Sequence, residues 1–488
     1  MGLNPITIQN YNIMKLFKQI LGSTLVIAAL VSCSTSQQQD LTVKTPVPPR
    51  PEGATDLINF AVAPIDTVKV GFVGLGMRGA DAVERFVYVP GSKIAAICDV
   101  VPERVDSSIS YLKRHNVELP ATYTGEEESW KGLCENPDVD LVYIATDWKN
   151  HVPIALYAMQ NGKHVAIEVP SAMTLDDIWA LIDLAETKRL HCTILENCVY
   201  DDFEINTLNM AQNGLFGEIL HTEGSYIHNL DEFWDYYYDN WRLNYNAEHR
   251  GDLYPTHGAG PAFQLLDIHR GDKVNTLVSM DTKSAGLPLW LEKNGREVPE
   301  NFKNGKANGD HTMTMMKTEN GKTIHIQHDV VNPRPYSRMY QLTGTQGFAN
   351  KYPWEGYAFQ PEQIAGDSIP DHENLSSHSF VSPEQRAALT EKYKHPILKE
   401  IGEKAKEVGG HGGMDYVMDY RLIYCLNNGL PLDMDIYDLA EWSAIKPLSE
   451  ISIENGYAPV EFPDFTRGSW NKVKGYRHAG VEGEAPVK

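Results

Sequence analysis

The chain has few cysteines and few basic residues for its length. Six cysteines occur among 488 residues, and none of them stands in a C-x-x-C motif. So sparse a set excludes a disulfide-stapled scaffold and a cysteine-rich zinc site. Lysine and arginine total 43 against 65 aspartates and glutamates, which gives a net charge of −22. This balance argues against nucleic acid or an anionic membrane face as partner. Internal repeats are also lacking, which excludes a repeat architecture.

The first residues have the pattern of an export signal. Residues 1–13 show no periodicity, and a basic segment then precedes an apolar run, Ile20–Val31, that is too short to span a membrane stably. The run ends in Leu-Val-Ser-Cys at Cys33, which resembles the box of a bacterial lipoprotein signal. An ordinary signal peptide with an incidental cysteine is the alternative. We expect residues 1–33 to be a leader with Cys33 as the lipidation site. The protein would then be exported and anchored to a bacterial membrane, in the periplasm or at the cell surface, through this lipid alone.

Residues 34–63 are polar and then rich in proline. Such composition is typical of a disordered tether. The remaining length exceeds what one ordinary domain needs, so we expect two domains after the tether.

The central motif is a complete G-x-G-x-x-G between a predicted strand and a predicted helix. An apolar run, Val68–Val73, precedes Gly74, Gly76 and Gly79. In this setting the first glycine permits a tight turn, the second lets the backbone approach a pyrophosphate, and the third lets helix pack on strand. The helix N-terminus offers N–H groups to the phosphates. Asp99, twenty residues after Gly79, stands where a carboxylate binds the ribose 2′-hydroxyl, so the motif predicts NAD rather than NADP.

Strand-like and helix-like segments alternate through the rest of the first half. Further strands are predicted at Ile94–Cys98, Val139–Thr146, His164–Val169 and Cys192–Leu195, with helices at Pro102–His115, Val152–Asn161 and Leu175–Arg189. The alternation predicts a Rossmann domain, an α/β doubly wound parallel sheet, at residues 64–200. Residues 201–488 would form a substrate-binding α+β domain with an open, largely antiparallel sheet, its C-terminal segment packing back on the Rossmann domain.

Three polar clusters follow predicted strands of the first domain. They are Asp147–His151, Glu168-Val169-Pro170 and Glu196-Asn197. In doubly wound sheets, ligands bind outside the carboxyl ends of the strands. Each cluster alone is also compatible with an ordinary polar loop between a strand and a helix. Their common placement beside the glycine turn favours contact with the nicotinamide.

The second half centres on one histidine. A strand near its start would put Tyr226 and His228 on one face. Downstream, the segment Asp252–Gly258 holds His257 between a proline and several glycines, and a helix is predicted from Ala262. An imidazole held in a fixed place can take a proton near neutral pH, as oxidation of a sugar hydroxyl requires. His257 is therefore the candidate base.

The order of these pieces resembles known families. The glycine motif, the strand ending in Asp99, IATDWKNH and a strand ending in Glu-x-Pro resemble the glucose–fructose oxidoreductase and inositol dehydrogenase family (Gfo/Idh/MocA). That family usually carries Glu-Lys-Pro, with the lysine near the reacting hydroxyl, whereas this chain has Glu168-Val169-Pro170. The second half closely resembles glycoside hydrolase family 109, the NAD-dependent α-N-acetylgalactosaminidases of the same superfamily. The resemblance rests on DLYPTHG, RGDKVNTLVSM, NPRPYSRMYQLTGTQG, HGGMDYVM and PDFTRGSW.

The family 109 resemblance implies particular roles. The implied catalytic residues are His257, acting on the proton of the C3 hydroxyl, and its neighbour Tyr254. The implied substrate contacts are Tyr226, Arg242, Tyr254, Pro255, Thr256, His257 and Tyr336. The implied cofactor contacts are Gly74, Gly76, Met77, Arg78, Gly79, Asp99, Trp148, Lys149, Asn150, His151, Glu168, Val169 and Asn197.

The chemistry implied by this resemblance differs from that of ordinary glycosidases, which need two carboxylates flanking the bond. A tightly bound NAD⁺ would oxidise the C3 hydroxyl, and loss of the acidified C2 proton would expel the C1 leaving group. Water would then add and the hydride would return, so a glycan is hydrolysed with no net NADH. The C2 base is left open between a tyrosine and Glu168.

Two other classes of function compete with this one. The first domain alone would permit an NAD-dependent sugar dehydrogenase, and a glycan-binding protein with a relic cofactor site is the third hypothesis. No metal is expected, because His325 and His328 are three apart and so fall on opposite faces of a strand. A homo-oligomer is expected by resemblance alone.

Overall fold

The first sheet is parallel and carries the glycine motif. The computed structural model describes residues 41–364, 369–371 and 375–482, so the leader and Cys33 lie outside the described residues. Strands run in the order β3-β2-β1-β4-β5-β6, and every neighbouring pair is parallel. The strands are β1 Val68–Val73, β2 Ser92–Asp99, β3 Ala121–Thr124, β4 Leu141–Ile144, β5 His164–Ile167 and β6 Cys192–Ile194. The predicted doubly wound sheet is confirmed.

Helices connect these strands and lie on the sheet. They are α2 Met77–Phe86, α3 Pro102–Arg114, α4 Trp130–Glu135, α5 Trp148–Gln160 and α6 Leu175–Lys188. Sequence reasoning missed β3 and α4. Strand β3 is an edge strand whose residues are mostly exposed, and α4 has only six residues, so neither shows a clear hydrophobic period.

The second sheet is larger and mostly antiparallel. Its order is β13-β12-β11-β7-β10-β9-β8-β14, and only β7 and β10 pair in parallel. Its strands are β7 Ile219–Ile227, β8 Val274–Asp281, β9 Thr312–Thr318, β10 Thr323–Asp329, β11 Tyr340–Gly344, β12 Gly347–Lys351, β13 Gly356–Phe359 and β14 Val460–Glu461. Burial alternates strictly along β9, so one face of this sheet packs on the core and the other is open.

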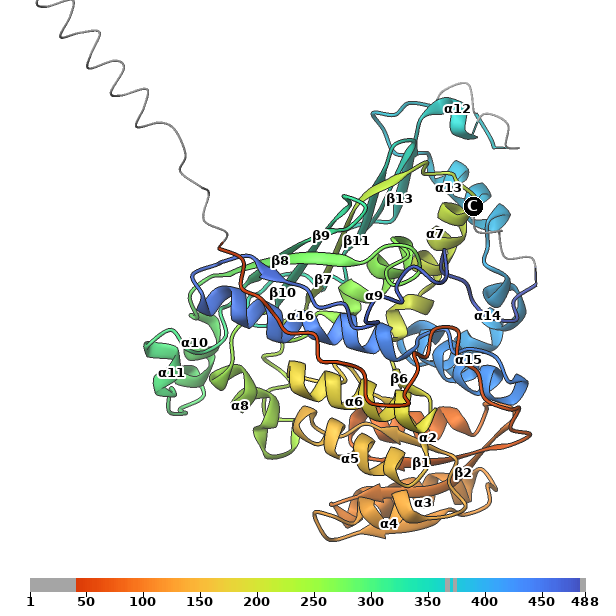
Figure 1. The fold of residues 1–488 in the computed structure, drawn as a ribbon, viewed down its shortest axis with the longest axis vertical. Coiled ribbons are helices and arrows are strands. Elements are labelled where there is room, and N and C mark those ends of the chain that lie inside the picture. The colour runs from red at the N-terminus through yellow and green to blue at the C-terminus, as the bar shows by residue number, and fades with distance from the viewer. Residues whose placement is uncertain (1–40, 365–368, 372–374, 483–488) are drawn as a thin grey trace, which may run out of the picture. The chain divides into compact units, whose positions relative to one another are not determined.

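Two helices join the sheets. Helix α9 (Thr256–Leu265) packs on β7, and α16 (Ile436–Glu454) lies between β8 on one side and α6 and β6 on the other (Figure 1). One hydrophobic core runs through both layers. The remaining helices are η1 Asn197–Tyr200, α7 Asp202–Gln212, η2 Tyr238–Asn240, α8 Trp241–Glu248, α10 Gly286–Lys293, α11 Glu300–Lys303, α12 Pro361–Ile364, α13 Pro383–Lys392, α14 Pro396–Val408, η4 His411–Gly413 and α15 Met414–Asn428.

Helix α9 begins earlier than the sequence predicts. The expected start at Ala262 is wrong, because the helix already starts at Thr256 and so includes His257. Close backbone packing explains the difference: a Cβ on Gly224 of β7 would lie 2.4 Å from the carbonyl oxygen of Gly258. Tertiary contact between two glycines thus stabilises a helical turn that local propensity disfavours.

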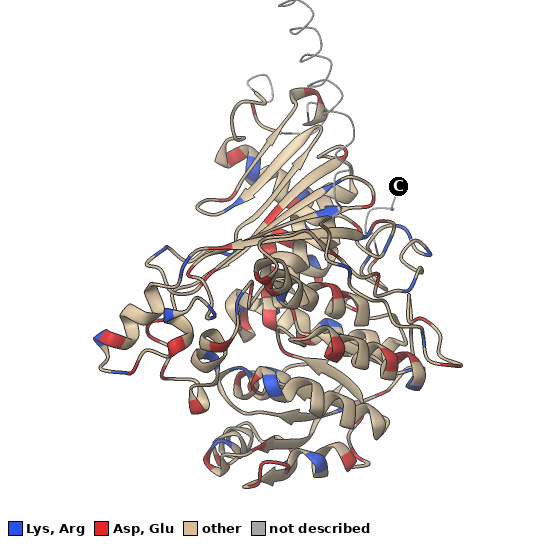
Figure 2. Cartoon of the chain, turned by 60° about the vertical axis from the view of Figure 1, so that its left-hand side comes forward, with Lys and Arg blue, Asp and Glu red and all other residues tan. Residues whose placement is uncertain are grey.

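The charged residues are spread over the molecule. Acidic and basic residues are spread along the chain in both halves and do not gather in one block (Figure 2). Among the described residues, no helix combines the length and apolarity that crossing a membrane requires.

Residues 43–63 form an ordered strap. Val43 pairs with Val460 of β14, and Arg50 Nε lies 2.8 Å from Glu186 Oε2 on α6. The strap therefore contacts both a Rossmann helix and the C-terminal part of the chain. The predicted disordered tether does not extend over these residues, because this proline-rich segment supplies side chains that pair with buried partners.

The strap depends on the buried carboxylate of Glu186. Arg50, Arg467 and Tyr437 all hydrogen-bond to it. Replacing Glu186→Gln removes the charge partner of Arg50 and one of the two charge partners of Arg467, so we expect a loss of about 3 kcal/mol in the free energy of unfolding. Thermal or urea denaturation measures this loss. The exposed Glu403→Gln is the control, and equal stability of the two variants would contradict the strap's role.

Candidate functional site

The glycine turn has the geometry that the sequence predicts. Gly74 has φ +90°, and a Cβ there would lie 2.5 Å from Ala145 O. A Cβ on Gly79 would lie 1.7 Å from Gly74 O, so helix and strand touch at that position. Gly76 differs, because the nearest atom to its Cβ position is Arg104 Nη1, 3.9 Å away. The turn is thus tight on two sides and open at Gly76, where a phosphate would approach.

The N-terminus of α2 faces the same opening. Gly76 is its N-cap and provides no side-chain cap, so the first N–H groups are available for an anion. Asp99 lies at the end of β2, where Oδ2 accepts from Leu75 N at 2.6 Å and Oδ1 from Val101 N at 2.8 Å. This carboxylate therefore fixes the turn. Its contact with a ribose hydroxyl stays a prediction.

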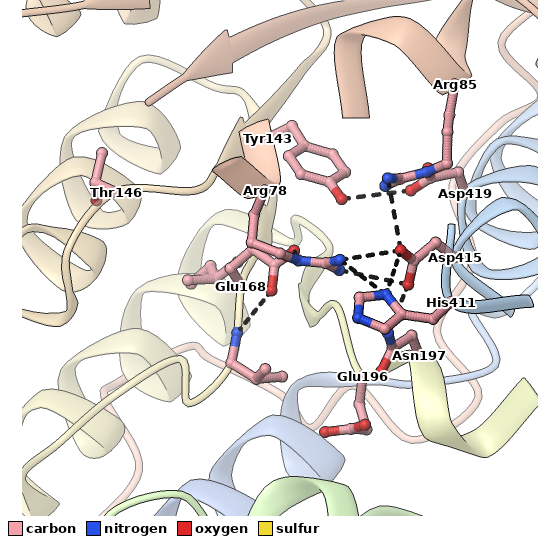
Figure 3. A network of polar contacts seen from close by, with 12 residues as sticks. Arg78, Arg85, Tyr143, Thr146, Glu168, Glu196, Asn197, His411, Asp415 and Asp419 are labelled. Carbon is pink, nitrogen blue, oxygen red and sulfur yellow. Dashed lines mark hydrogen bonds and ion pairs between the residues drawn. The ribbon is translucent and has the colours of Figure 1, made fainter. Parts of the chain in front are cut away.

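A polar network lies beside the turn (Figure 3). Arg78, in the first turn of α2, places Nε 3.0 Å from Glu168 Oε1 and Nη1 2.9 Å from Asp415 Oδ2. Asn197 Nδ2 donates to Asp415 Oδ1 at 2.5 Å, and His411 Nδ1 lies 2.9 Å from Asp415 Oδ2. The network therefore brings together three predicted cofactor residues, Arg78, Glu168 and Asn197, around one carboxylate from α15.

Asp415 is held ionised by its partners. Burial alone would raise the pKa of this carboxyl, but the guanidinium of Arg78, the hydrogen bond from His411 and the charge of Arg85 bring it well below the ordinary value. A carboxyl whose pKa is lower in the folded protein than in the unfolded chain stabilises the fold at every pH above the unfolded pKa. These contacts therefore persist throughout the neutral pH range and are lost only in strong acid.

The segment Trp148–His151 forms the first turn of α5, because the helix starts four residues before the predicted Val152. The Trp148 indole donates to Val169 O at 3.3 Å. His151 is buried, with its nitrogens 3.1 Å from Pro170 O and 3.2 Å from Thr146 O. His151 thus braces the loops after β4 and β5.

Lys149 and Asn150 lie differently from their neighbours in this turn. Lys149 is exposed, and the Asn150 amide bonds Asp147 Oδ1 at 2.9 Å. Of the four residues Trp148–His151, Trp148 alone packs on the rings around Arg242, where it contacts Tyr254.

Arg242 lies among the rings of the predicted sugar pocket. Its guanidinium carbon is 4.8 Å from the ring centre of Tyr254, 5.3 Å from Trp148, 5.4 Å from Tyr237 and 5.9 Å from Tyr226. Arg242 Nη1 donates to the Tyr237 hydroxyl at 2.9 Å. The guanidinium is buried, and its Nε is unpartnered, so the site holds a donor that a sugar oxygen would satisfy.

His257 is held by a carboxylate that sequence reasoning had assigned to the cofactor side. Its Nδ1 lies 2.6 Å from Glu196 Oε1, and Glu196 is fully buried. Burial alone would raise the pKa of Glu196, but His257 and a hydrogen bond from Cys198 N lower it below the ordinary value. The His257 ring lies 5.0 Å from Tyr254 and 5.4 Å from Tyr226. The imidazole is thus oriented at the edge of the aromatic cluster around Arg242.

A metal is not needed to explain the acids around His257. Glu196, Cys198 and His257 bring ligand-type atoms within 4.8 Å of one another. Arg338 donates to Cys198 Sγ at 3.3 Å, and burial raises the pKa of that thiol well above its ordinary value. A neutral thiol is a poor metal ligand, and His257 Nδ1 already pairs with Glu196.

Two further histidines line the pocket. Tyr226 OH and His228 Nδ1 are 2.9 Å apart, so the predicted shared face is confirmed. The His328 ring lies 6.3 Å from Tyr226, whereas His325 Nδ1 contacts Glu223 at 3.5 Å, so the two histidines of β10 face opposite sides as predicted. Burial lowers the pKa of His328 to about 3 and that of His228 to about 4. Both imidazoles are neutral at physiological pH.

The other predicted substrate residues surround this cluster. Pro255 is the N-cap of α9, and Thr256 is its buried first residue. Tyr336 packs edge-on against His228, 4.9 Å between centres, and is 40% exposed. Tyr336 therefore lies at the rim rather than inside the pocket.

Comparison with known proteins agrees with this arrangement. The family model described as "Glycosyl hydrolase 109, C-terminal domain" matches residues 200–472. That range covers more than half of the chain. The chain belongs to glycosyl hydrolase family 109. A second model, "Oxidoreductase family, NAD-binding Rossmann fold", matches residues 68–195.

Relatives in family 109 match nearly the whole chain. "Glycosyl hydrolase family 109 protein 1" of Phocaeicola vulgatus is 59% identical over 94% of this chain and 98% of its own length. The protein of the same name from Bacteroides thetaiotaomicron is 56% identical over 95% and 100%. "Glycosyl hydrolase family 109 protein" of Porphyromonas gingivalis is 56% identical over 96% and 100%.

Solved structures share the fold at low identity. A levoglucosan dehydrogenase in complex with NADH has a TM-score of 0.57 at 18% identity, covering 81% of this chain and 99% of its own. The myo-inositol dehydrogenase of Lactobacillus casei, in complex with NAD(H) and myo-inositol, has a TM-score of 0.54 at 16% identity, covering 82% and 99%. The two-domain fold is therefore that of the Gfo/Idh/MocA proteins.

Two residues of this family 109 site escaped sequence reasoning. Glu196 was grouped with the nicotinamide contacts, and Asp415 was noticed only within HGGMDYVM. Each is an acid in an ordinary setting, one after a short strand and one in a helix. Their partners, His257 and Arg78, lie 61 and 337 residues away, so no local signal links them.

The network predicts how the cofactor is retained. We expect purified protein to release NAD in stoichiometric amount on denaturation. Asp415→Asn removes the charge that fixes Arg78, so NAD affinity should fall about tenfold, corresponding to ~1.4 kcal/mol. Enzymatic cycling of the released NAD measures this loss. Asp419→Asn is the matched control, since Asp419 pairs with Arg85 on the same helix face. Equal NAD content in the two variants would contradict the role of Asp415.

Proposed function

We propose that this family 109 chain hydrolyses terminal α-N-acetylgalactosamine, or a related sugar, from glycans in a reaction that uses and regenerates NAD⁺. The observation that carries the proposal is the buried Glu196–His257 pair at the edge of the aromatic pocket. Glu196 is fully buried against the imidazole, so it is placed to orient His257 and not to flank a glycosidic bond as a carboxylate of an ordinary glycosidase does.

The residues present suit NAD. The open side of Gly76 and the N-terminus of α2 would hold the pyrophosphate, and Asp99 the ribose. Glu168 and Asn197 would lie at the nicotinamide end, since both join the network beside the turn. When bound, NAD⁺ supplies a hydride acceptor for oxidation of the sugar C3 carbon and a donor for its later reduction.

His257 would take the proton of the C3 hydroxyl. Glu196 occupies Nδ1, which leaves Nε2 as the nitrogen that meets the sugar. The buried carboxylate stabilises the imidazolium that forms and fixes the ring plane, as in other base–orienter pairs. Arg242 would bind an acetamido or hydroxyl oxygen and fix the sugar relative to His257.

The C2 base is one of two groups. Glu168 points toward Arg78, whose guanidinium Nε lies 3.0 Å from Glu168 Oε1. Tyr226 has a proton acceptor in His228, 2.9 Å from its hydroxyl, and the Arg242 cation lies 5.9 Å from its ring. Burial raises the pKa of Tyr254 well above the ordinary value, so its hydroxyl would serve as a hydrogen-bond donor.

Export and lipid attachment at Cys33 belong to the same proposal. The cofactor would then work outside the cytoplasm, where it must stay bound between turnovers. Tight retention by the network around Asp415 would meet that requirement.

The first test follows p-nitrophenol release from its α-N-acetylgalactosaminide together with NADH absorbance. We expect release without NADH accumulation, and His257→Ala should lower kcat about 1,000-fold because its proton acceptor is lost. His325→Ala, on the opposite side of the sheet, is the matched control. Accumulation of NADH without release would instead identify a sugar dehydrogenase, and sugar binding with neither signal a glycan-binding protein.

The second test concerns Glu196. Glu196→Gln keeps the shape but removes the charge, so kcat should fall about 100-fold while KM changes little. A neutral amide also stabilises an imidazolium less than a carboxylate does, so the acidic limb of the kcat/KM–pH profile should move to lower pH. Glu223→Gln, on β7 but away from His257, is the control. An unchanged pH profile would mean that Glu196 has only a structural role.

A further inference from the structure

A row of aromatic rings leads away from the rim of the pocket. The aromatic row consists of Tyr336, Tyr352, Trp354 and Phe380. The ring centres of Tyr336 and Tyr352 are 6.3 Å apart, and those of Trp354 and Phe380 are 6.5 Å apart. Trp354 is 61% exposed and Phe380 41% exposed, although large apolar side chains are usually buried. Neither ring belongs to the sugar pocket described above.

Strand pairing places the row beside the pocket. Ile227, at the end of β7, bridges Ser337, and Tyr340 of β11 pairs with Lys351 at the end of β12. The end of β7, the start of β11 and the end of β12 therefore lie at one end of the sheet. Since the order is β12-β11-β7, the turn that bears Trp354 is two strands away from Tyr226.

The backbone under the exposed rings is fixed. Asn350 Nδ2 donates to Trp354 O at 2.7 Å, and Arg386 Nη1 donates to Glu355 O at 2.8 Å. At the base of the turn, the buried Lys351 ammonium lies 2.7 Å from Asp201 and 2.8 Å from Glu204. An exposed ring on a fixed backbone loses little freedom when a ligand covers it, so such rings are suited to binding.

The row suits a neutral ligand. Three cations of the described residues lie beside it, Lys351, Arg386 and Arg338, and each is paired with a carboxylate. Flat rings pack against the apolar C–H faces of sugar rings, while sugar hydroxyls stay in water. The row starts at Tyr336, at the exposed edge of the aromatic cluster around Arg242, so a glycan whose terminal sugar binds at that cluster has its next units at the row.

We propose that the aromatic row is a subsite for the leaving-group side of the substrate, and that it binds neutral saccharide units next to the sugar that is cleaved. This inference rests on the proposed function for its substrate class. It makes the enzyme prefer extended glycans over simple glycosides, because only an extended glycan reaches Trp354.

The kinetic test compares two substrates with the same α-linked terminal sugar, a p-nitrophenyl glycoside and a trisaccharide that carries the sugar on lactose. Trp354→Ala should lower kcat/KM for the trisaccharide about tenfold and leave the p-nitrophenyl glycoside unchanged. Trp354→Phe should restore most of the loss, since it keeps a flat ring. Tyr236→Ala is the control, because Tyr236 is also exposed but lies outside the row.

A binding measurement separates this inference from the proposed function. Saturation-transfer NMR with lactose alone, which needs no hydrolysis, should give a signal with wild type that Trp354→Ala loses. If wild type cleaves neither substrate but shows this signal, the proposed function fails and the subsite stands. Equal kcat/KM of wild type and Trp354→Ala on the trisaccharide would overturn the subsite. The subsite would also be overturned if Tyr236→Ala, and not Trp354→Ala, lowered kcat/KM for the trisaccharide. The same holds if Trp354→Ala lowered kcat/KM for a glycopeptide but not for the trisaccharide.

Discussion

One buried carboxylate connects the two halves of the molecule. Asp415, at the start of α15, holds Arg78 in the first turn of α2, Arg85 two turns later and Asn197 after β6. A charge buried at this depth costs several kcal/mol unless it is paired, and each of these partners is needed to offset that cost. These contacts fix the cofactor loop against α15 of the second domain, beside the hydrophobic core that the two halves share.

The His257–Glu196 pair shows how that geometry serves chemistry. Glu196 comes from the end of the parallel sheet, and His257 comes from a helix that packs on the antiparallel sheet. Their 2.6 Å contact exists only when the two sheets are correctly placed. The orientation of the imidazole therefore depends on both domains and is set only in the folded protein.

The shared fold does not by itself separate a dehydrogenase from a glycosidase. Levoglucosan and inositol dehydrogenases have the same two-domain architecture at less than a fifth identity. Function therefore has to be argued from the residues of the site. In this chain valine stands at the centre of Glu168-Val169-Pro170, and His257 of the second domain pairs with Glu196 of the first. Arg78 of the glycine turn is fixed by both Glu168 and Asp415.

The sequence by itself determined the local features. Val68–Val73, Gly74, Gly76 and Gly79 specify a strand, a turn and a helix through nearest neighbours alone, and the structure reproduces them. The alternation of strands and helices likewise predicted the sheet. Family resemblance then named the pocket residues, because the run around His257 is continuous in the chain.

Tertiary structure alone decided which distant groups meet. The early start of α9 depends on Gly224 lying against Gly258, and the ordered strap depends on Arg50 reaching Glu186. In both pairs, the residues that flank one partner in the sequence do not indicate the other partner. The pairing of Glu196 with His257 has the same origin. The sequence around a carboxylate does not identify the residue that it pairs with. Hydrogen bonds and charge pairs depend on distance in space, and the fold alone sets that distance.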